Sequence, residues 1–425
     1  MSTLTDPPKD GFRLSQLIYD TRYRSMTIQI VAFVLIMLGL SWLVSNTIQN
    51  LSALGKDFNF GFLGQPAGYD INQRLIEYDS QASHGRAALV GILNTLLVAI
   101  LGCVAATIVG VFVGVLRLSH NWLVSRLMAV YVEGFRNVPL LLWILLIFAV
   151  FNESTPQPRD FRGENPAATM MLGDSVAITN RGTYIPEPLF SRSLGDLAVN
   201  PGWIFQDLFF RISLDLVVIV AFVVASLFAI GRINARAHRI QDATGTRPNT
   251  LWLNLAVFFV PLAALLWALG FHLGYPALKG FNFAGGTHIR NSLMALWLAL
   301  TLYTGAFIAE IVRAGILSVS RGQTEASHAL GIRHGPTLRL VIIPQALRVI
   351  IPPLISQYLN LTKNSSLGIL IGYSDLFNVF GGISLNQTGQ AIEIIFMSMS
   401  VYLCFSLLIS LYMNWYNRRI ALTER

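Results

Sequence analysis

The chain has 425 residues, of which 54% are hydrophobic and only 12% charged, and its mean hydropathy is +0.57. This composition is too apolar for an ordinary soluble protein and indicates a membrane protein. The formal net charge of +8 would favour nucleic-acid binding only if the basic residues gathered on one folded surface, so we interpret it as a sign of membrane topology and expect no nucleic-acid partner.

Apolar runs follow one another along the whole chain, and each is long enough to cross a hydrocarbon core about 30 Å thick. We expect an all-α, polytopic membrane protein with about eight transmembrane helices. They are predicted at residues 26–48, 87–117, 127–151, 212–231, 251–273, 291–318, 350–373 and 391–414. An even number of spans places both termini on the same side of the membrane.

The distribution of charge indicates which side that is. The segments on the side of the amino terminus hold 18 Lys and Arg against 6 Asp and Glu, whereas the opposite segments hold 10 against 11. Positive charge marks the cytoplasmic side, so we predict that both termini are cytoplasmic. The outer segments 49–86 and 152–211 are rich in Gly, Pro, Asn and acidic residues, which favours irregular or short-helical structure.

Several kinds of site are not indicated by this sequence. Acidic residues stand among the bases of the first 25 residues and no small-residue cleavage site follows, so we expect no signal peptide. Cys103 and Cys404 lie inside apolar runs and suggest neither a disulfide nor a metal framework. No lysine completes a phosphate-binding P-loop, so the chain is not expected to hydrolyse ATP in this way; the four lysines are Lys9, Lys56, Lys279 and Lys363.

A basic, half-polar segment at 321–348, RGQTEASHALGIRHGPTLRLVIIPQALR, separates two apolar runs. Thr324 can cap a first short helix, and Gly331 ends it because glycine most readily adopts the left-handed conformation. A second helix begins near Pro336, which suits a first helical turn. We predict two short helices at an angle on the cytoplasmic surface, a shape that fits a partner's groove. The alternative is a basic amphipathic loop at the lipid surface.

This segment resembles the EAA loop of type I ABC importer permeases. The resemblance rests on Glu325-Ala326-Ser327, on Gly331 six residues after Glu325, and on VIIPQALR. Ser327 replaces the second alanine of the family's pattern, and Ile343 precedes Pro344. The resemblance implies that the loop seats in a cleft of a separate ATP-binding subunit. The residues expected to couple the chain to that subunit are Arg321, Gly322, Glu325, Ala326, Ala329 and Gly331.

Three further stretches are similar to the polar amino-acid permeases within this family. They are YVEGFRNVPLLLWILLIF at 131–148, YTGAFIAEIVRAGILSVSRGQTEA at 303–326 and LNLTKNSSLGILIGYSDL at 359–376. Usual members of this group are much shorter. The extra first helix, the long outer loops and the inserted pair 212–273 make the chain most similar to the large permease subunit of general L-amino acid or glutamate/glutamine/aspartate/asparagine importers.

The resemblance also implies an organisation and a set of partners. It implies a bacterial inner-membrane complex with a second permease, two ATP-binding subunits, a periplasmic amino-acid-binding protein and membrane lipid. ATP and Mg would be bound by the ATPase subunits, and this chain would hold no cofactor, no metal and no catalytic residue. We expect the chain to be organised as 1–86, 87–151, 152–290, 291–414 and 415–425, with the permease core in 87–151 and 291–414. The alternative is an ion-coupled secondary carrier acting alone, which predicts no EAA segment.

Polar side chains inside the apolar runs are candidates for the substrate path, because each buried ionisable group in a bilayer costs at least about 2.5–3.5 kcal/mol. Glu310, with Tyr303 and Thr304 about two turns earlier, is a candidate to bind the ammonium group of a transported amino acid. The alternative is an ion pair between Glu310 and Arg313 on the same helix.

Two other groups complete the candidate path. The stretch 363–366 falls where the seventh run is expected to be deep in the membrane, and it suggests a gate or a carboxylate-binding site, with helix packing as the alternative. Its residues are Lys363, Asn364, Ser365 and Ser366. Arg136 precedes Pro139, which can kink its helix and free carbonyls toward a cavity. A pair between Arg136 and Glu133 is the alternative.

Overall fold

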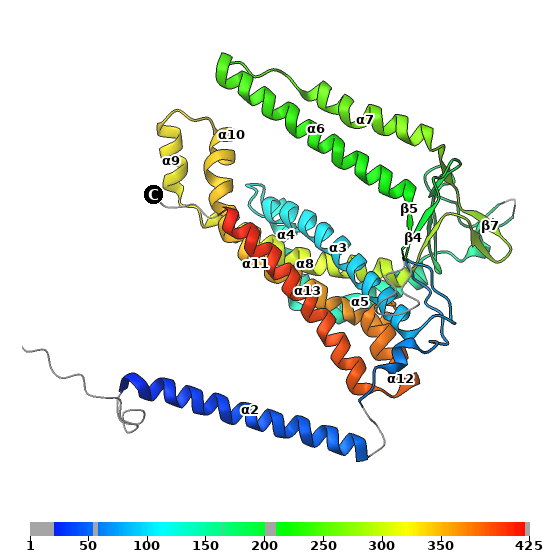
Figure 1. Ribbon diagram of the computed structural model, residues 1–425. Helices are drawn as coiled ribbons and strands as arrows, with labels where there is room; N and C mark the ends of the chain where they lie inside the picture. Colours follow the sequence, from blue (N-terminus) through cyan, green and yellow to red (C-terminus); the bar gives the residue numbers. More distant parts are fainter. Residues whose placement is uncertain (1–20, 54–57, 164, 200–209, 421–425) are drawn as a thin grey trace, which may run out of the picture. The chain divides into compact units, whose positions relative to one another are not determined.

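The computed structural model describes residues 21–53, 58–163, 165–199 and 210–420 (Figure 1). Contacts divide the chain into two units, Met1–Phe60 and Gly61–Arg425. Within the first unit the structure describes the helix α2 (Thr21–Ala53). Its residues Arg24–Ala53 are long and apolar enough to cross a membrane, and they contain the predicted run 26–48.

The predicted all-α architecture with about eight spans is confirmed. Among the described residues, seven helices are long and apolar enough to cross a membrane, and the number is eight if one bent pair of helices is counted as a span. The bent pair is α4 (Trp122–Asn137) and α5 (Leu140–Ser154), which meet at 108°. A single helix over 127–151 was therefore the wrong expectation. Pro139 stands at the break, where it removes a backbone donor and ends helical continuity.

The core of the second unit is built around α8 (Asn291–Leu317), which packs against α3 (His84–Leu116), α4, α5 and α11 (Ile343–Asn364). Figure 1 shows α3, α8, α11 and α13 (Ala391–Ile420) gathered in one bundle. The approach of α3 to α8 requires glycine, because a Cβ at Gly110 would lie 2.5 Å from the Cβ of Ile308. Small residues at such contacts allow membrane helices to pack closely.

The inserted pair consists of α6 (Leu214–Thr244) and α7 (Leu251–Ala268), which lie side by side (Figure 1). Asn234 on α6 accepts hydrogen bonds from Thr250 at 3.1 Å and from Asn254 at 3.0 Å. Helix α6 continues to Thr244, so residues 232–244, which were expected to form a loop, are helical. The helix ends where Gly245 adopts a left-handed φ of 74°.

The outer segment 152–211 differs from the prediction, because it holds β-strands as well as the short helix η2 (Pro158–Phe161), and further strands follow α7. The described part of 49–86 holds the short helix η1 (Gly61–Gly64), as predicted. Strands β1 (Ala177–Thr179), β2 (Gly182–Ile185) and β9 (Thr287–Ile289) form one antiparallel sheet. Three two-stranded ladders accompany it, and they pair β3 (Glu187–Phe190) with β6 (Phe271–Gly274), β4 (Asp196–Val199) with β5 (Phe210–Ser213), and β7 (Ala277–Lys279) with β8 (Asn282–Ala284). Strands of three or four residues are too short to show a clear alternating pattern in the sequence.

The segment 321–348 forms the predicted short helices, α9 (Arg321–Ala329) and α10 (His334–Thr337). A π-helical turn, η3 (Leu338–Ile342), leads into α11. Ser320, and not Thr324, precedes the first turn of α9, so Thr324 lies inside the helix rather than capping it.

The seventh predicted span is not one continuous α-helix, since α11 gives way to the 3-10 helix η4 (Ser365–Ile371) and then to a left-handed turn at Gly372. The chain continues through the π-helical η5 (Phe377–Ser384) and the short α12 (Leu385–Thr388) before α13 begins. Helices broken in this way are common where membrane transporters bind substrate, because the break leaves polar groups inside the membrane.

Candidate functional site

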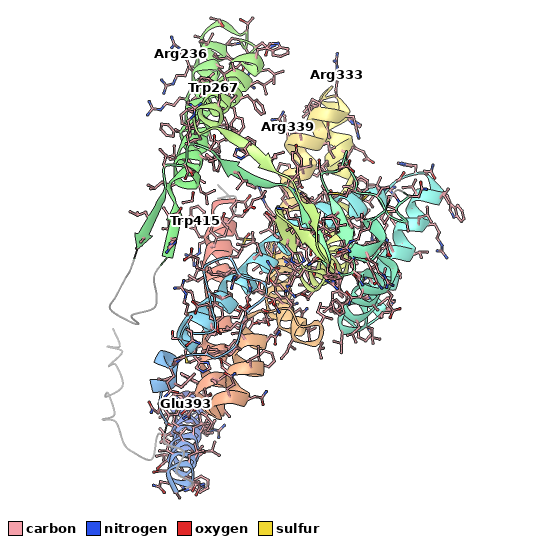
Figure 2. The ribbon with its side chains drawn as sticks, turned by 90° about the vertical axis from the view of Figure 1, so that its right-hand side faces the viewer. Arg236, Trp267, Arg333, Arg339, Glu393 and Trp415 are labelled. Carbon is pink, nitrogen blue, oxygen red and sulfur yellow. The ribbon has the colours of Figure 1, made fainter. Side chains whose placement is uncertain are left out.

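All six residues expected to couple the chain to an ATPase are exposed on α9 or directly after it. The side chain of α9 that faces inward is Ser327, which is 5% exposed and donates a hydrogen bond to the carbonyl of Gln323 at 2.7 Å. Figure 2 shows Arg333 at the tip of the segment, projecting away from the helices. The segment therefore presents a free helical surface with its charged residues outward.

Gly331 fixes the direction in which the chain leaves α9. It adopts a φ of 74°, its N–H donates to the carbonyl of His328 at 2.9 Å, and the N–H of Ile332 donates to the carbonyl of Ser327 at 3.0 Å. These bonds close the carboxyl end of α9 and satisfy carbonyls that the helix leaves open. The predicted role of Gly331 as the end of the first short helix is confirmed by this geometry.

Leu330 is a residue of this surface that the sequence reasoning did not single out. Its side chain is 79% exposed although leucine is normally buried. It stands beside Gly331 at the end of α9, next to Ala329. The sequence signal for this residue was a leucine directly before a helix-ending glycine, because this position places an apolar side chain at the tip of a helix.

Lys363 lies at the depth of the middle of the bundle. Two residues earlier, Leu361 faces Gly102, near the centre of α3, where an added Cβ would lie 3.1 Å from the Leu361 Cδ2. The Lys363 side chain is exposed in the chain, and it forms no ion pair with any residue that the structure describes. A charged side chain at this depth is costly to place in lipid, which makes Lys363 a candidate for a functional site.

The neighbours of Lys363 are divided between two environments. Ser366 lines a cavity of about 430 Å³ together with Lys363. Asn364 ends α11, and Ser365 is fully buried, with its hydroxyl bonded to the carbonyl of Thr362 at 2.8 Å. Of the stretch 363–366, the structure thus brings Lys363 and Ser366 together at one cavity and turns Ser365 inward.

The opposite wall of this cavity comes from α13, which the sequence reasoning did not include in the path. Ser398, Met399 and Tyr402 lie on that wall, and Phe377 of η5 joins them. Single hydroxyl groups in a long apolar helix carry no sequence signal of their own. Only the packing of α13 beside α11 brings them to Lys363.

Glu310 lies in a cluster of ion pairs and outside the cavity of Lys363. It accepts hydrogen bonds from the guanidinium group of Arg117 and from that of Arg313, the latter at 2.6 Å. Arg117 also lies 3.4 Å from Glu133. The ion pair between Glu310 and Arg313, which was the alternative prediction for Glu310, is thus present in the structure. Arg117, which joins α3 to α8, was missed because it stands at the very end of its apolar run.

The remaining candidates lie beside this cluster or at the helix break. Arg136 does not pair with Glu133 among the described ion pairs, and instead its guanidinium lies 5.4 Å from the centre of the Phe307 ring. Tyr303 contacts the same ring at 5.1 Å, and Thr304 is 3% exposed. Pro139 is at the junction of α4 and α5. In the described ranges, no group of three or more His, Cys, Asp or Glu is placed to hold a metal ion.

Comparison with known proteins gives consistent matches along the chain. The sequence profile of the family described as binding-protein-dependent transport system inner membrane component matches residues 197–422. The chain is 56% identical over 433 residues to the glutamate/glutamine/aspartate/asparagine transport system permease protein BztB of Rhodobacter capsulatus, with 100% of both chains covered. It is 43% identical over 418 residues to the general L-amino acid transport system permease protein AapQ of Rhizobium johnstonii, covering 98% of this chain and 96% of that one. Among solved structures, an amino acid ABC transporter with histidines matches at a TM-score of 0.43 and 17% identity, over 79% of this chain and 95% of that chain.

Proposed function

Because the chain belongs to the family of binding-protein-dependent transport system inner membrane components, we propose that it is the permease subunit of an ATP-binding-cassette importer for polar L-amino acids. The observation that carries the substrate class is the 56% identity, over the full length of both chains, to a permease named for glutamate, glutamine, aspartate and asparagine transport. These four amino acids are the proposed cargo.

The importer draws its energy from separate ATP-binding subunits, and this chain has no ATPase site of its own. The exposed face of α9 supports this proposal, because it offers a short helix with outward charges and the apolar tip Leu330 to a groove. Two ATPase subunits that close on ATP would move two such helices together and switch the bundle between inward-facing and outward-facing states. ATP and Mg belong to those subunits.

The substrate path runs past Lys363 at the break between α11 and η4. Its ammonium group lies at mid-bundle depth without an ion-pair partner in the described part of the chain, which supports a carboxylate-binding role. Its exposure in this chain supports a second permease subunit that covers the same surface. Glu310 is held between two arginines, so we assign it to the joint between α3 and α8 and not to the path.

The proposed topology places both termini and α9 in the cytoplasm of a bacterium and the β-strands in the periplasm. The excess of Lys and Arg in the segments beside α9 supports this orientation. The periplasmic sheets and ladders then form the face that a substrate-binding protein meets. The permease core comprises residues 87–151 and 291–414, with 212–273 as an added helical pair.

Uptake by reconstituted vesicles tests the proposed function. The complete complex, with the binding protein and ATP supplied on their proper sides, is expected to accumulate labelled glutamate, glutamine, aspartate and asparagine. Accumulation is expected to stop when a non-hydrolysable ATP analogue replaces ATP and to be unaffected when ionophores abolish the ion gradients. Uptake that follows an ion gradient without ATP would show instead that the chain is a secondary carrier.

A further inference from the structure

The cavity beside Lys363 has the chemical character of an anion site. Lys363 and four hydroxyl-bearing residues line it beside the apolar side chains of Phe377, Ile395, Met399 and Leu403, and the residues that line it include no aspartate or glutamate. Its volume of about 430 Å³ lies within the range of pockets that hold small molecules. A carboxylate is the group of an amino acid that such a lining would accept, since an ammonium group would meet the positive charge of Lys363.

Ser398 on α13 carries a hydroxyl group with an unmet hydrogen-bonding capacity. The residue lines the cavity and is 4% exposed, and its buried Oγ has no hydrogen-bond partner among the residues that the structure describes. Ser400, two residues along the same helix, behaves differently, because its hydroxyl donates to the carbonyl of Phe396 at 2.8 Å. A buried hydroxyl without a partner is unfavourable, so a ligand that accepts its hydrogen bond is stabilised.

The wall that carries Ser398 is held in place by a buried carboxyl group. Tyr402, one turn beyond Ser398, also lines the cavity, and its hydroxyl donates to Asp375 Oδ2 at 3.1 Å. Asp375 is fully buried, and its Oδ1 accepts a hydrogen bond from the backbone N–H of Asn378 at 2.9 Å. These bonds tie the α13 wall of the cavity to the connection between η4 and η5.

We propose that the cavity between α11 and α13 binds a carboxylate of the transported amino acid, with Lys363 supplying the charge and Ser398 donating a hydrogen bond to the same group. This inference rests on the proposed function and deepens it, because it adds α13 to the substrate site. The carboxylate is either the backbone group, which every amino acid carries, or the side-chain group, which only glutamate and aspartate carry.

The test is equilibrium binding of labelled glutamate and glutamine to the purified permease–ATPase complex without the periplasmic binding protein. Removing the binding protein matters because its own affinity would otherwise dominate. Ser398→Ala is expected to weaken binding about tenfold, as loss of a hydrogen bond to a charged group does, and Ser398→Thr to retain most of the affinity. Ser400→Ala is the matched control, since its hydroxyl is bonded within the helix, and it is expected to bind as the wild type does.

The two amino acids separate the two sources of the carboxylate. Equal weakening for glutamate and glutamine in Ser398→Ala identifies the backbone carboxylate, and weakening for glutamate alone identifies the side-chain group. Wild-type affinity in Ser398→Ala, or no binding by a complex that transports both amino acids, overturns the inference and leaves the proposed function standing. A complex that transports no amino acid in the presence of its binding protein and ATP overturns both. An unchanged melting temperature in Ser398→Ala shows that weakening does not come from misfolding.

Discussion

Gly331 allows the geometry of α9 to be tested by a change of one methyl group. A Cβ at this position would meet nothing within 4 Å, so Gly331→Ala adds no clash. Its φ of 74°, however, is a conformation that costs an ordinary L-residue about 1–2 kcal/mol. If α9 must keep this turn to bind the ATPase, the same free energy lowers the population of the binding-competent conformation about 5- to 30-fold. Gly335→Ala is the matched control, because that glycine also has open space and does not have a positive φ.

The assay is ATP-driven amino-acid uptake in vesicles, measured beside the ATPase rate and the amount of permease in the membrane. Gly331→Ala is expected to reduce uptake several-fold at unchanged permease content, whereas Gly335→Ala retains it. Gly331→Asn is expected to restore much of the loss, since asparagine adopts the left-handed conformation more readily than alanine does. Equal activity of Gly331→Ala and Gly335→Ala would refute the role assigned to this turn.

Three other substitutions test separate parts of the structure. Leu330→Ala removes an exposed apolar side chain whose burial in a partner's groove would contribute about 1.5–2 kcal/mol. The affinity of the ATPase for the permease, measured by titrated co-purification, is therefore expected to fall about 10- to 30-fold. Unchanged affinity would contradict a role for Leu330 in this contact. Glu310→Gln leaves two arginines without their shared carboxylate and is expected to destabilise the bundle by about 1–3 kcal/mol. The measurement is the melting temperature, which is expected to fall. A change in amino-acid selectivity at constant melting temperature would contradict the structural role of Glu310. Burial lowers the pKa of His288; nearby Arg290 lowers it further, and a hydrogen bond to the carbonyl of Arg181 opposes the shift. Because the pKa is lower in the folded than in the unfolded state, the sheet of β1, β2 and β9 loses stability as the pH falls below about 6.5. His288→Gln is expected to remove that pH dependence of hydrogen exchange in β2, and an unaltered pH profile would count against it.

The spans, the two short helices and the left-handed Gly331 could be predicted because each has a strong local cause. Long apolar runs have few alternatives in a bilayer, and a glycine between two helical patterns indicates a left-handed turn. The bend at Pro139 was foreseen as a kink, but its angle of 108° depends on how α4 and α5 pack against α8, which is not local information. The outer strands were missed because their pairing joins residues as far apart as Ile185 and Thr287.

The candidate site was predicted only in part for the same reason. Lys363 is conspicuous in the sequence because it is charged within an apolar run. Ser398 and Tyr402 are ordinary residues of an apolar helix, and they acquire meaning only when α13 packs beside α11. Glu310 shows the opposite case, since it is conspicuous in sequence and yet is neutralised by Arg117, which lies far away along the chain.

A separate ATPase that acts on this permease through α9 must contact α9 in the assembled transporter, and a cross-link can detect that contact. Ala329 is exposed on α9, so a cysteine at this position, in a chain whose Cys103 and Cys404 are replaced by serine, is available to a partner. In the assembled transporter, a short bifunctional reagent is expected to join residue 329 to the ATP-binding subunit, with a yield that changes when ATP is bound. A complex that transports amino acids but gives no such cross-link, while a cysteine elsewhere on the cytoplasmic surface does, would show that the ATPase acts at a different surface.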